Sequence, residues 1–159
     1  MTAAAAVQQQ LVTFRLGDDH FAVDVAVVER VLRYTAPSVV PNLPAWIDGV
    51  IEHGGRVVPV IDLRTRFQMP RLASRPEHRI LVLEIGADWL GVTVDSVHEV
   101  MSVGAEEIAP PPPLFRGLAA EYLKGLVRRE GSLLIFLDVA RVLTSSELLE
   151  LTTATAPHG

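Results

Sequence analysis

The chain has 159 residues, 49% of them hydrophobic, and a formal net charge of −5 at pH 7. This is enough apolar material for one core or two small ones, and the acidic balance argues against a protein that binds duplex nucleic acid through a basic face. The chain has no cysteine, which excludes disulfides, thiolate catalysis and cysteine-ligated zinc and is typical of a reducing cytosol.

No apolar run reaches the roughly 18 residues that a transmembrane helix needs. Residues 1–10 lack the basic start of a signal peptide and are expected to form a flexible tail. We therefore expect a soluble, cytoplasmic protein that does not insert into a membrane.

The first predicted element is a β-hairpin. Residues 11–16 alternate like a half-buried strand, residues 17–19 form a turn, and residues 20–25 alternate again. Residues 26–33 are compatible with a helical turn or with a strand. Three prolines then indicate a connection at an edge of a sheet or outside it: Pro37, Pro41 and Pro44.

The second predicted hairpin spans residues 49–63 and turns at Gly54 and Gly55. Pro59 removes a hydrogen-bond donor from the second strand, which predicts a strand at the edge of a sheet or a bulge. Asp62 is expected to cap a short helix that runs to about Phe67.

The rest of the chain divides into a linker and a second half. Residues 68–78 read as an exposed linker, because the arginines around them are irregularly spaced and no aromatic residue interleaves them, which disfavours a phosphate-binding patch. We expect a first β-barrel subdomain over residues 11–67 and a second over residues 79–143. Residues 144–159 are expected to form a C-terminal helix and a frayed tail.

The two halves repeat one pattern. Residues 49–63 align with residues 125–139, and residues 21–31 align with residues 90–100 without a gap. Two copies are too few for an open solenoid, so the repeat predicts two small closed β units packed on each other.

The sequence offers few candidates for catalytic residues. In the repeat Asp62 matches Asp138, and both follow a strand and precede a helical run, so helix capping is favoured over a catalytic carboxylate pair. Asp95, His98 and Glu99 offer metal-ligand types, but the first half has no such trio at the matching positions, which favours a structural or surface role. The sequence contains no known nucleophile, zinc-protease or phosphate-loop motif. We expect no enzyme activity, no metal and no cofactor.

An ordered series of motifs runs along most of the chain: Phe14-x-Leu16-Gly17, Val23-Asp24-Val25, Pro41-x-x-Pro44, Gly49-Val50-Ile51, Val57-Val58-Pro59-Val60-Ile61-Asp62-Leu63-Arg64, Gly91-Val92-x-Val94-Asp95-x-Val97-x-Glu99-Val100 and Glu121-Tyr122-Leu123-x-Gly125. Over about residues 11–151 the sequence resembles the CheW family of bacterial chemotaxis coupling proteins. The resemblance implies an all-β fold with short helices, in which two SH3-like five-stranded β-barrels share strands.

The resemblance also implies a function. It indicates a noncatalytic adaptor, monomeric on its own, that couples methyl-accepting chemoreceptors to the regulatory domain of a CheA-type histidine kinase in a membrane-associated array. The alternatives are a divergent regulator that binds only kinase or only receptor and, from another class, an enzyme built on a small β-barrel. A receptor helix is implied in a groove between the barrels, at Val28, Arg30, Val97 and Glu99. Kinase contacts are implied at His53, Gly54, Gly55, Arg56, Leu114 and Phe115.

Two positions depart from the family pattern. Gly54 stands where the family has the arginine of an Asn-Leu-Arg-Gly turn, and Arg30 stands where it has the acid of Val-x-Glu-Val. Because Glu52 lies two residues before Gly54, we hypothesise an Arg30–Glu52 ion pair of reversed polarity, with two independent surface charges as the alternative.

Overall fold

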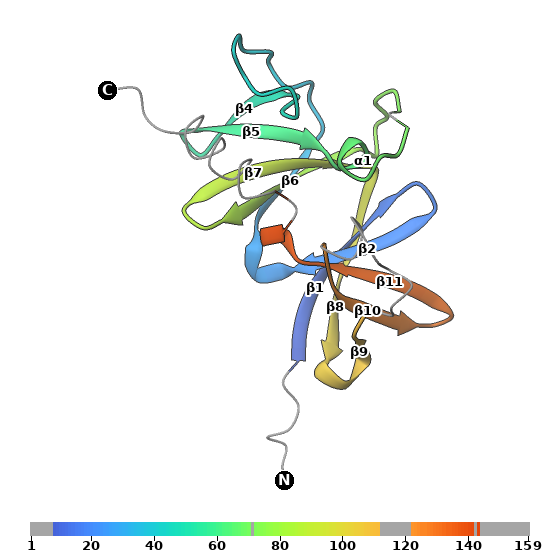
Figure 1. The fold of residues 1–159 in the computed structure, drawn as a ribbon. Coiled ribbons are helices and arrows are strands. Elements are labelled where there is room, and N and C mark those ends of the chain that lie inside the picture. Colours follow the sequence, from blue (N-terminus) through green and yellow to red (C-terminus); the bar gives the residue numbers. More distant parts are fainter. Residues whose placement is uncertain (1–7, 71, 112–121, 142, 144–159) are drawn as a thin grey trace.

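The computed structural model describes residues 8–70, 72–111, 122–141 and 143. Its strands form two curled sheets, one above the other in Figure 1, which are called sheet A and sheet B. Sheet A has the strand order β8-β1-β2-β11-β10-β9 and sheet B the order β3-β6-β7-β5-β4.

The strands of sheet A are β1 (Gln8–Leu16), β2 (Asp19–Asp24), β8 (Ser96–Gly104), β9 (Ile108–Ala109), β10 (Leu123–Arg129) and β11 (Ser132–Leu137). Those of sheet B are β3 (Val28–Arg33), β4 (Gly49–His53), β5 (Arg56–Asp62), β6 (Arg79–Ile85) and β7 (Asp88–Val94). Short helical segments join them: η2 (Val25–Val27), α1 (Leu63–Arg66), η3 (Ala105–Glu107) and η4 (Val139–Arg141).

Each sheet combines a hairpin from one half of the chain with strands from the other half. Hairpin β1–β2 lies between β8 and β11, whereas hairpin β6–β7 lies between β3 and β5. The joining pairs are parallel and equivalent in the repeat, because Ala22 lies opposite Phe136 and the matching Gly91 lies opposite Val60. This exchange leaves neither hairpin with an unpaired edge. It confirms the expected all-β fold of two barrel-like units that share strands.

The exchange also bears on the expected subdomain ranges. Residues 11–67 and 79–143 follow the repeat in the sequence, but each sheet draws strands from both ranges. The sheets and the ranges differ because the first hairpin of each half, β1–β2 or β6–β7, pairs with strands of the opposite half.

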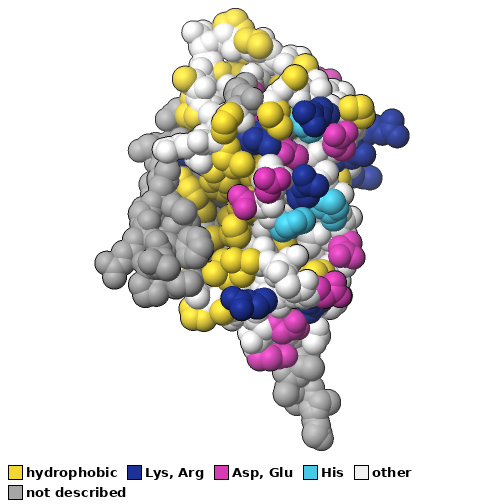
Figure 2. Space-filling model, turned by 90° about the vertical axis from the view of Figure 1, so that its right-hand side faces the viewer, with side chains coloured by type: hydrophobic (Ala, Val, Ile, Leu, Met, Phe, Trp, Pro, Cys, Tyr) yellow, Lys and Arg dark blue, Asp and Glu magenta, His cyan; other side chains and the backbone are white. Residues whose placement is uncertain are grey.

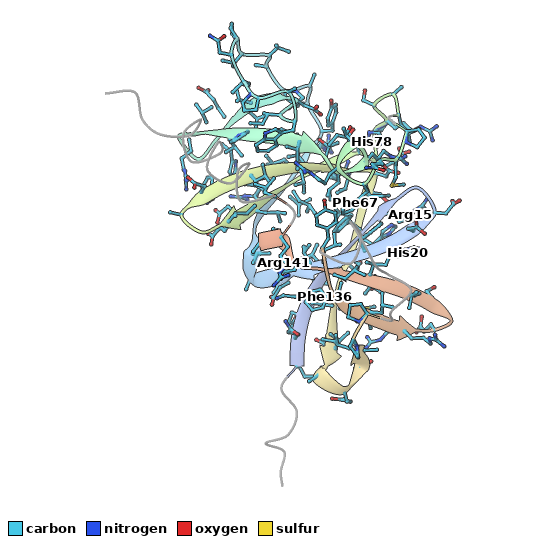
Figure 3. All side chains as sticks on the ribbon, in the orientation of Figure 1. Arg15, His20, Phe67, His78, Phe136 and Arg141 are labelled. Atoms are coloured by element: carbon cyan, nitrogen blue, oxygen red, sulfur yellow. The ribbon has the colours of Figure 1, made fainter. Side chains whose placement is uncertain are left out.

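The main hydrophobic core lies between the sheets and contains a chain of aromatic rings. Phe21 stacks on Phe14 and on Phe67, each at 5.7 Å between ring centroids, and Phe67 contacts Tyr122 at 5.4 Å. A second core lies within sheet A around Phe136, and Figure 3 labels Phe67 and Phe136 at these two places. Hairpin β1–β2 is therefore buried on both faces, because successive side chains of a strand point to opposite sides.

The local structure agrees with the predicted helix caps and differs from the prediction for Pro59. Asp62 accepts a hydrogen bond from the Arg64 amide at 2.9 Å, and Asp138 accepts one from the Ala140 amide at 3.1 Å, which confirms both as helix caps. Residues 26–33 contain both of the alternatives, since η2 leads directly into β3. The prediction for Pro59 was wrong, because β5 lies inside sheet B and pairs with β4 in continuous register. The parallel pairing with β7 begins only at Val60, just after the proline.

The linker is exposed over residues 72–77, but its ends are held. The Arg64 guanidinium donates a hydrogen bond to the Pro70 carbonyl at 3.0 Å, and the buried His78 ring meets Tyr34 edge-on. The predicted C-terminal helix and both terminal tails lie outside the described residues, apart from residues 8–10 at the start of β1.

Candidate functional site

Val28 and Val97, predicted to line a groove between the barrels, occupy matching places in the two sheets. Val28 begins β3 and Val97 is the second residue of β8, and these strands form one edge of sheet B and of sheet A. Both side chains are partly buried and pack against the core between the sheets. They therefore contribute to the core as well as offering surface to a partner.

Two further valines on these edge strands were not singled out from the sequence. Val31 on β3 is 39% exposed and Val100 on β8 is 54% exposed, and the repeat places them at equivalent positions. The repeat could have identified both valines, because the aligned segments 21–31 and 90–100 both end on them. Each edge strand thus presents one exposed valine and, three residues earlier, one half-buried valine.

Charged residues separate the two valines on each strand. Arg30 lies on β3 opposite Val82 of β6, and Glu99 lies on β8, where its backbone amide and carbonyl both bond the Thr13 hydroxyl. Arg30 and Glu99 are both exposed. The matched positions therefore carry opposite charges, which makes the two edge surfaces electrostatically different.

The hypothesis of an Arg30–Glu52 ion pair is wrong. Among the described residues no ion pair joins these side chains. Glu52 lies on β4 at the opposite edge of sheet B from β3, with three strands between them.

The predicted kinase-binding turn connects β4 and β5 and lies against Trp89 of the β6–β7 hairpin. Gly54 and Gly55 have φ angles of 58° and 75°, as a tight two-residue hairpin turn requires. The Arg56 guanidinium lies 4.1 Å from the Trp89 ring centroid, and the His53 ring centroid lies 5.7 Å from it. A Cβ atom at residue 54 would touch the same indole at 3.4 Å, so this turn is packed onto the ring.

The equivalent turn of sheet A, between β10 and β11, has a different chemistry. Glu130 and Gly131 take the positive φ angles of 51° and 79°. Arg129 forms an ion pair with Glu107 at 2.6 Å and donates to the Ser102 carbonyl at 3.0 Å. A hydrogen bond from the Gly104 amide, together with Arg129, lowers the pKa of Glu107. Leu114 and Phe115, the other predicted kinase contacts, lie outside the described residues.

A largely buried ion pair, which sequence reasoning missed, ties α1, the β7–β8 junction and the β1–β2 turn together. Asp95, between β7 and β8, accepts hydrogen bonds from Arg64 Nε at 2.9 Å, from Arg64 Nη2 at 2.5 Å and from the Gly17 amide at 2.7 Å. Burial works to raise the pKa of Asp95, but these bonds and the guanidinium charge outweigh it and hold the pKa below its ordinary value. The hydrogen bond to Asp95 raises the pKa of Arg64.

No cluster of three or more metal-ligating side chains occurs in the described part of the chain, and Asp95 is engaged by Arg64. Asp62 and Asp138 cap separate helical segments in different parts of the fold. Within the described ranges no helix is long and apolar enough to cross a membrane. What the described surface does offer is apolar and charged area: in Figure 2 hydrophobic side chains gather beside a band of charged and histidine side chains.

Comparisons with known proteins find a matching family and similar relatives. Residues 10–147 match the family model described as the CheW-like domain. The chain is 34% identical over 146 residues to a chemotaxis protein CheW of Klebsiella aerogenes, covering 92% of this chain and 88% of that protein. It is 32% identical over 150 residues to protein FrzA of Myxococcus xanthus, covering 94% and 91% of the two chains.

A solved structure is similar as well. The crystal structure of the scaffolding protein TtCheW from Thermoanaerobacter tengcongensis superposes with a TM-score of 0.78 at 27% identity. The match covers 86% of this chain and 92% of that one. The similarity thus extends over both sheets and is not limited to one repeat.

Proposed function

The chain belongs to the CheW family, and we propose that it is a noncatalytic cytoplasmic adaptor that couples chemoreceptors to a CheA-type histidine kinase in a bacterial chemosensory array. The observation that carries this proposal is the pair of equivalent edge strands, β3 and β8, each with an exposed valine three residues after a core-packed one. An adaptor has to hold two partners at once, and the chain offers these edge strands to one partner and the separate β4–β5 turn, at the other edge of sheet B, to the other.

The receptor is assigned to the surface of β3 and β8. An amphipathic helix binds through apolar side chains spaced along one face, and it needs exposed apolar area on the protein it meets. Val31 and Val100 supply such area, and Val28 and Val97 on the same strands are only partly buried. Arg30 and Glu99 then set the direction of the helix through their opposite charges.

The kinase is assigned to the turn from His53 to Arg56, with Leu114 and Phe115 as contacts of the second barrel. The support for the turn is its rigidity, because Trp89 packs against both ends of it. A turn that is already ordered loses little conformational entropy on binding.

The experiment measures binding of a receptor tip fragment and of a kinase regulatory domain separately, by calorimetry. Val31→Glu and Val100→Glu should each weaken receptor binding about tenfold, equivalent to about 1.4 kcal/mol, because a charge is placed in an apolar contact. Kinase binding and the melting temperature should stay near wild type, since both valines are exposed.

The matched control is Val39→Glu, which changes a valine that is 84% exposed and lies outside the strands. It should leave both affinities unchanged. Unaltered receptor binding in both edge-strand variants would contradict the assignment of this surface.

The second candidate, a regulator that binds only one partner, is favoured by Arg30 and Gly54. Arg30 reverses the charge on the receptor surface, and Gly54 removes a guanidinium from the kinase turn. The same titrations decide between the two candidates, because an adaptor binds both fragments, whereas the regulator binds only one of them.

A further inference from the structure

The surface beside the β1–β2 turn of sheet A and the surface beside the β6–β7 turn of sheet B correspond to each other in the repeat. Each of these surfaces is called the mouth of its barrel. Gly86 matches Gly17 and Leu90 matches Phe21, so Trp89 of sheet B is equivalent to His20 of sheet A. Both residues follow a hairpin turn and point to the face opposite the core between the sheets, because the next residues, Leu90 and Phe21, face that core. The large ring in one sheet is thus replaced by a small one in the other.

In sheet B the mouth is filled from within the chain. The Trp89 indole lies beneath Arg56 at 4.1 Å and beside His53 at 5.7 Å, measured to the ring centroid. A cation over an indole face is attracted by the ring electrons, so this arrangement stabilises the closed mouth.

In sheet A the same place is a hollow. A pocket of about 240 Å³ lies beside the His20 side chain, which is smaller than tryptophan. Its walls come from β1, β2, β8, β10 and β11 and comprise Thr13, His20, His98, Glu99, Met101, Arg129, Glu130, Ser132 and Leu134. Pockets for drug-sized molecules have volumes of about 300 Å³ or more, so this one is the size of a single side chain. His20 lies on β2 close to Arg15 in Figure 3.

The lining favours a neutral aromatic ring that carries a hydrogen-bond donor. Met101 and Leu134 form an apolar floor that belongs to the core of sheet A. His20 and His98 stand 6.3 Å apart at a tilt of 52°, which gives two ring faces or edges for aromatic contact. The rim carries Arg129 together with Glu99 and Glu130, so its charges are mixed and neither a strong anion nor a strong cation is selected.

An indole satisfies all of these features. Its apolar body would lie on Met101 and Leu134, its ring would meet the imidazoles, and its N–H would donate to a rim carboxylate, Glu99 or Glu130. Buried tryptophan side chains usually find such a partner for the N–H. A leucine would bury apolar area but would leave the rim carboxylates without the donor.

We propose that the mouth of sheet A is a docking pocket for a tryptophan side chain presented by a partner protein, the place that Trp89 fills internally in sheet B. The site lies beside Glu99 and is distinct from the β4–β5 turn. It does not depend on which partner the adaptor surfaces bind.

The test is a titration of the full chain with the capped peptide acetyl-Gly-Trp-Gly-amide, followed by amide chemical shifts in two-dimensional NMR. Shifts are expected around Thr13, His20, His98 and Ser132. The matching Gly-Leu-Gly peptide should bind at least fivefold more weakly. Shifts confined to other parts of the chain, or equal binding of both peptides, would overturn the proposal.

Two variants sharpen the test. His20→Trp makes the mouth resemble that of sheet B and should abolish peptide binding, with unchanged shifts in sheet B as evidence of an intact fold. Trp89→His should open the second mouth and add a second set of shifts near Gly54 and Arg56. If Trp89→His fails to fold, His20→Trp alone still decides the question, because persistent binding by that variant would refute the pocket. Free tryptophan that binds as tightly as the peptide would indicate a small-molecule site instead and would also contradict the proposal.

Discussion

The two places where a β-hairpin meets the exchanged strands of the other half have the same topology but different chemistry. In sheet B the strand β5 leads into α1, whose Arg64 reaches Asp95 after β7. In sheet A the equivalent strand β11 leads into η4, and the repeat places Ala140 and Ala26 where the ion pair would be. The shared topology thus needs only the repeated strand pattern, whereas the charged connection is an addition to one side.

This asymmetry suggests that the two sides contribute unequally to stability. The Arg64 and Asp95 side chains are 8% and 16% exposed, so the pair is mostly removed from water. Such a pair adds little net stability over well-packed apolar groups, but loss of one partner leaves the other charge buried without compensation. Ala26 and Ala140, at the equivalent positions of the other side, carry no charge that could be left without a partner.

The largest effect is therefore expected for Arg64→Ala. It removes the guanidinium that faces the Asp95 carboxylate, keeps the hydrogen bond from the Gly17 amide, and should lower the free energy of unfolding by about 3 kcal/mol. Urea denaturation followed by circular dichroism measures the change. Arg33→Ala, at an exposed position of β3, is the control and should cost less than about 0.5 kcal/mol. Equal losses in the two variants would show that the ion pair does not distinguish the two sides.

A smaller effect, equal in both sheets, is expected at two equivalent glycines. A Cβ atom at Gly49 would lie 2.5 Å from the Ser38 carbonyl oxygen, and one at Gly125 would lie 2.7 Å from the Ala109 carbonyl oxygen. In both places a neighbouring backbone segment crosses the start of the strand, which explains why the repeat keeps glycine there. Gly49→Ala and Gly125→Ala should each cost about 1–3 kcal/mol, since the backbone has to move.

Gly104→Ala is the control for this pair. The atoms nearest to a Cβ at residue 104 belong to the Glu106 side chain, which can rotate away. Its loss in the same urea experiment should be clearly smaller. If Gly49→Ala and Gly125→Ala differ by more than about 1 kcal/mol, the two strand starts are not structurally equivalent.

The smallest effect concerns the dependence of the free energy of unfolding on pH. Because the pKa of Asp95 is lowered in the folded protein, its ionised form stabilises the fold above the unfolded-state pKa of about 4. This contribution is lost as the pH falls below about 4 through the lower folded-state pKa. The free energy of unfolding of the wild type, measured from pH 6 to pH 2.5, should thus fall more steeply below pH 4 than that of Arg64→Ala. Parallel curves would indicate that Asp95 gains nothing from Arg64.

Much of the local structure was predictable from the sequence. Alternation of apolar and polar residues located the hairpins, and the Gly-Gly turn at residues 54 and 55 takes the positive φ angles that it suggested. Asp62 and Asp138 cap helical segments as expected, because an acid between a strand and a helical run satisfies free amides wherever the rest of the chain goes. The ordered series of motifs also indicated the family, which the matched domain model confirms.

The candidate site could be predicted only in part from the sequence. Val28 and Val97 were identified from the resemblance, but the exposure of Val31 and Val100 depends on β3 and β8 being edge strands. Whether a strand lies at an edge is a property of the whole sheet. The same holds for Trp89, whose contacts with His53 and Arg56 join segments more than thirty residues apart.

What the sequence determined by itself was the strands of the repeated hairpins, their turns and caps, and the fact that they occur twice. Only the tertiary structure decided which strands pair. Since hairpins β1–β2 and β6–β7 carry the same pattern, alternation is satisfied equally well by pairing within a half or between halves. Packing chose the exchanged arrangement, in which Phe14 and Phe21 of one half join Leu81, Leu83 and Tyr122 of the other in a single core. The Arg64–Asp95 pair follows from that choice, because only the folded chain brings α1, the β7–β8 junction and the β1–β2 turn to one place.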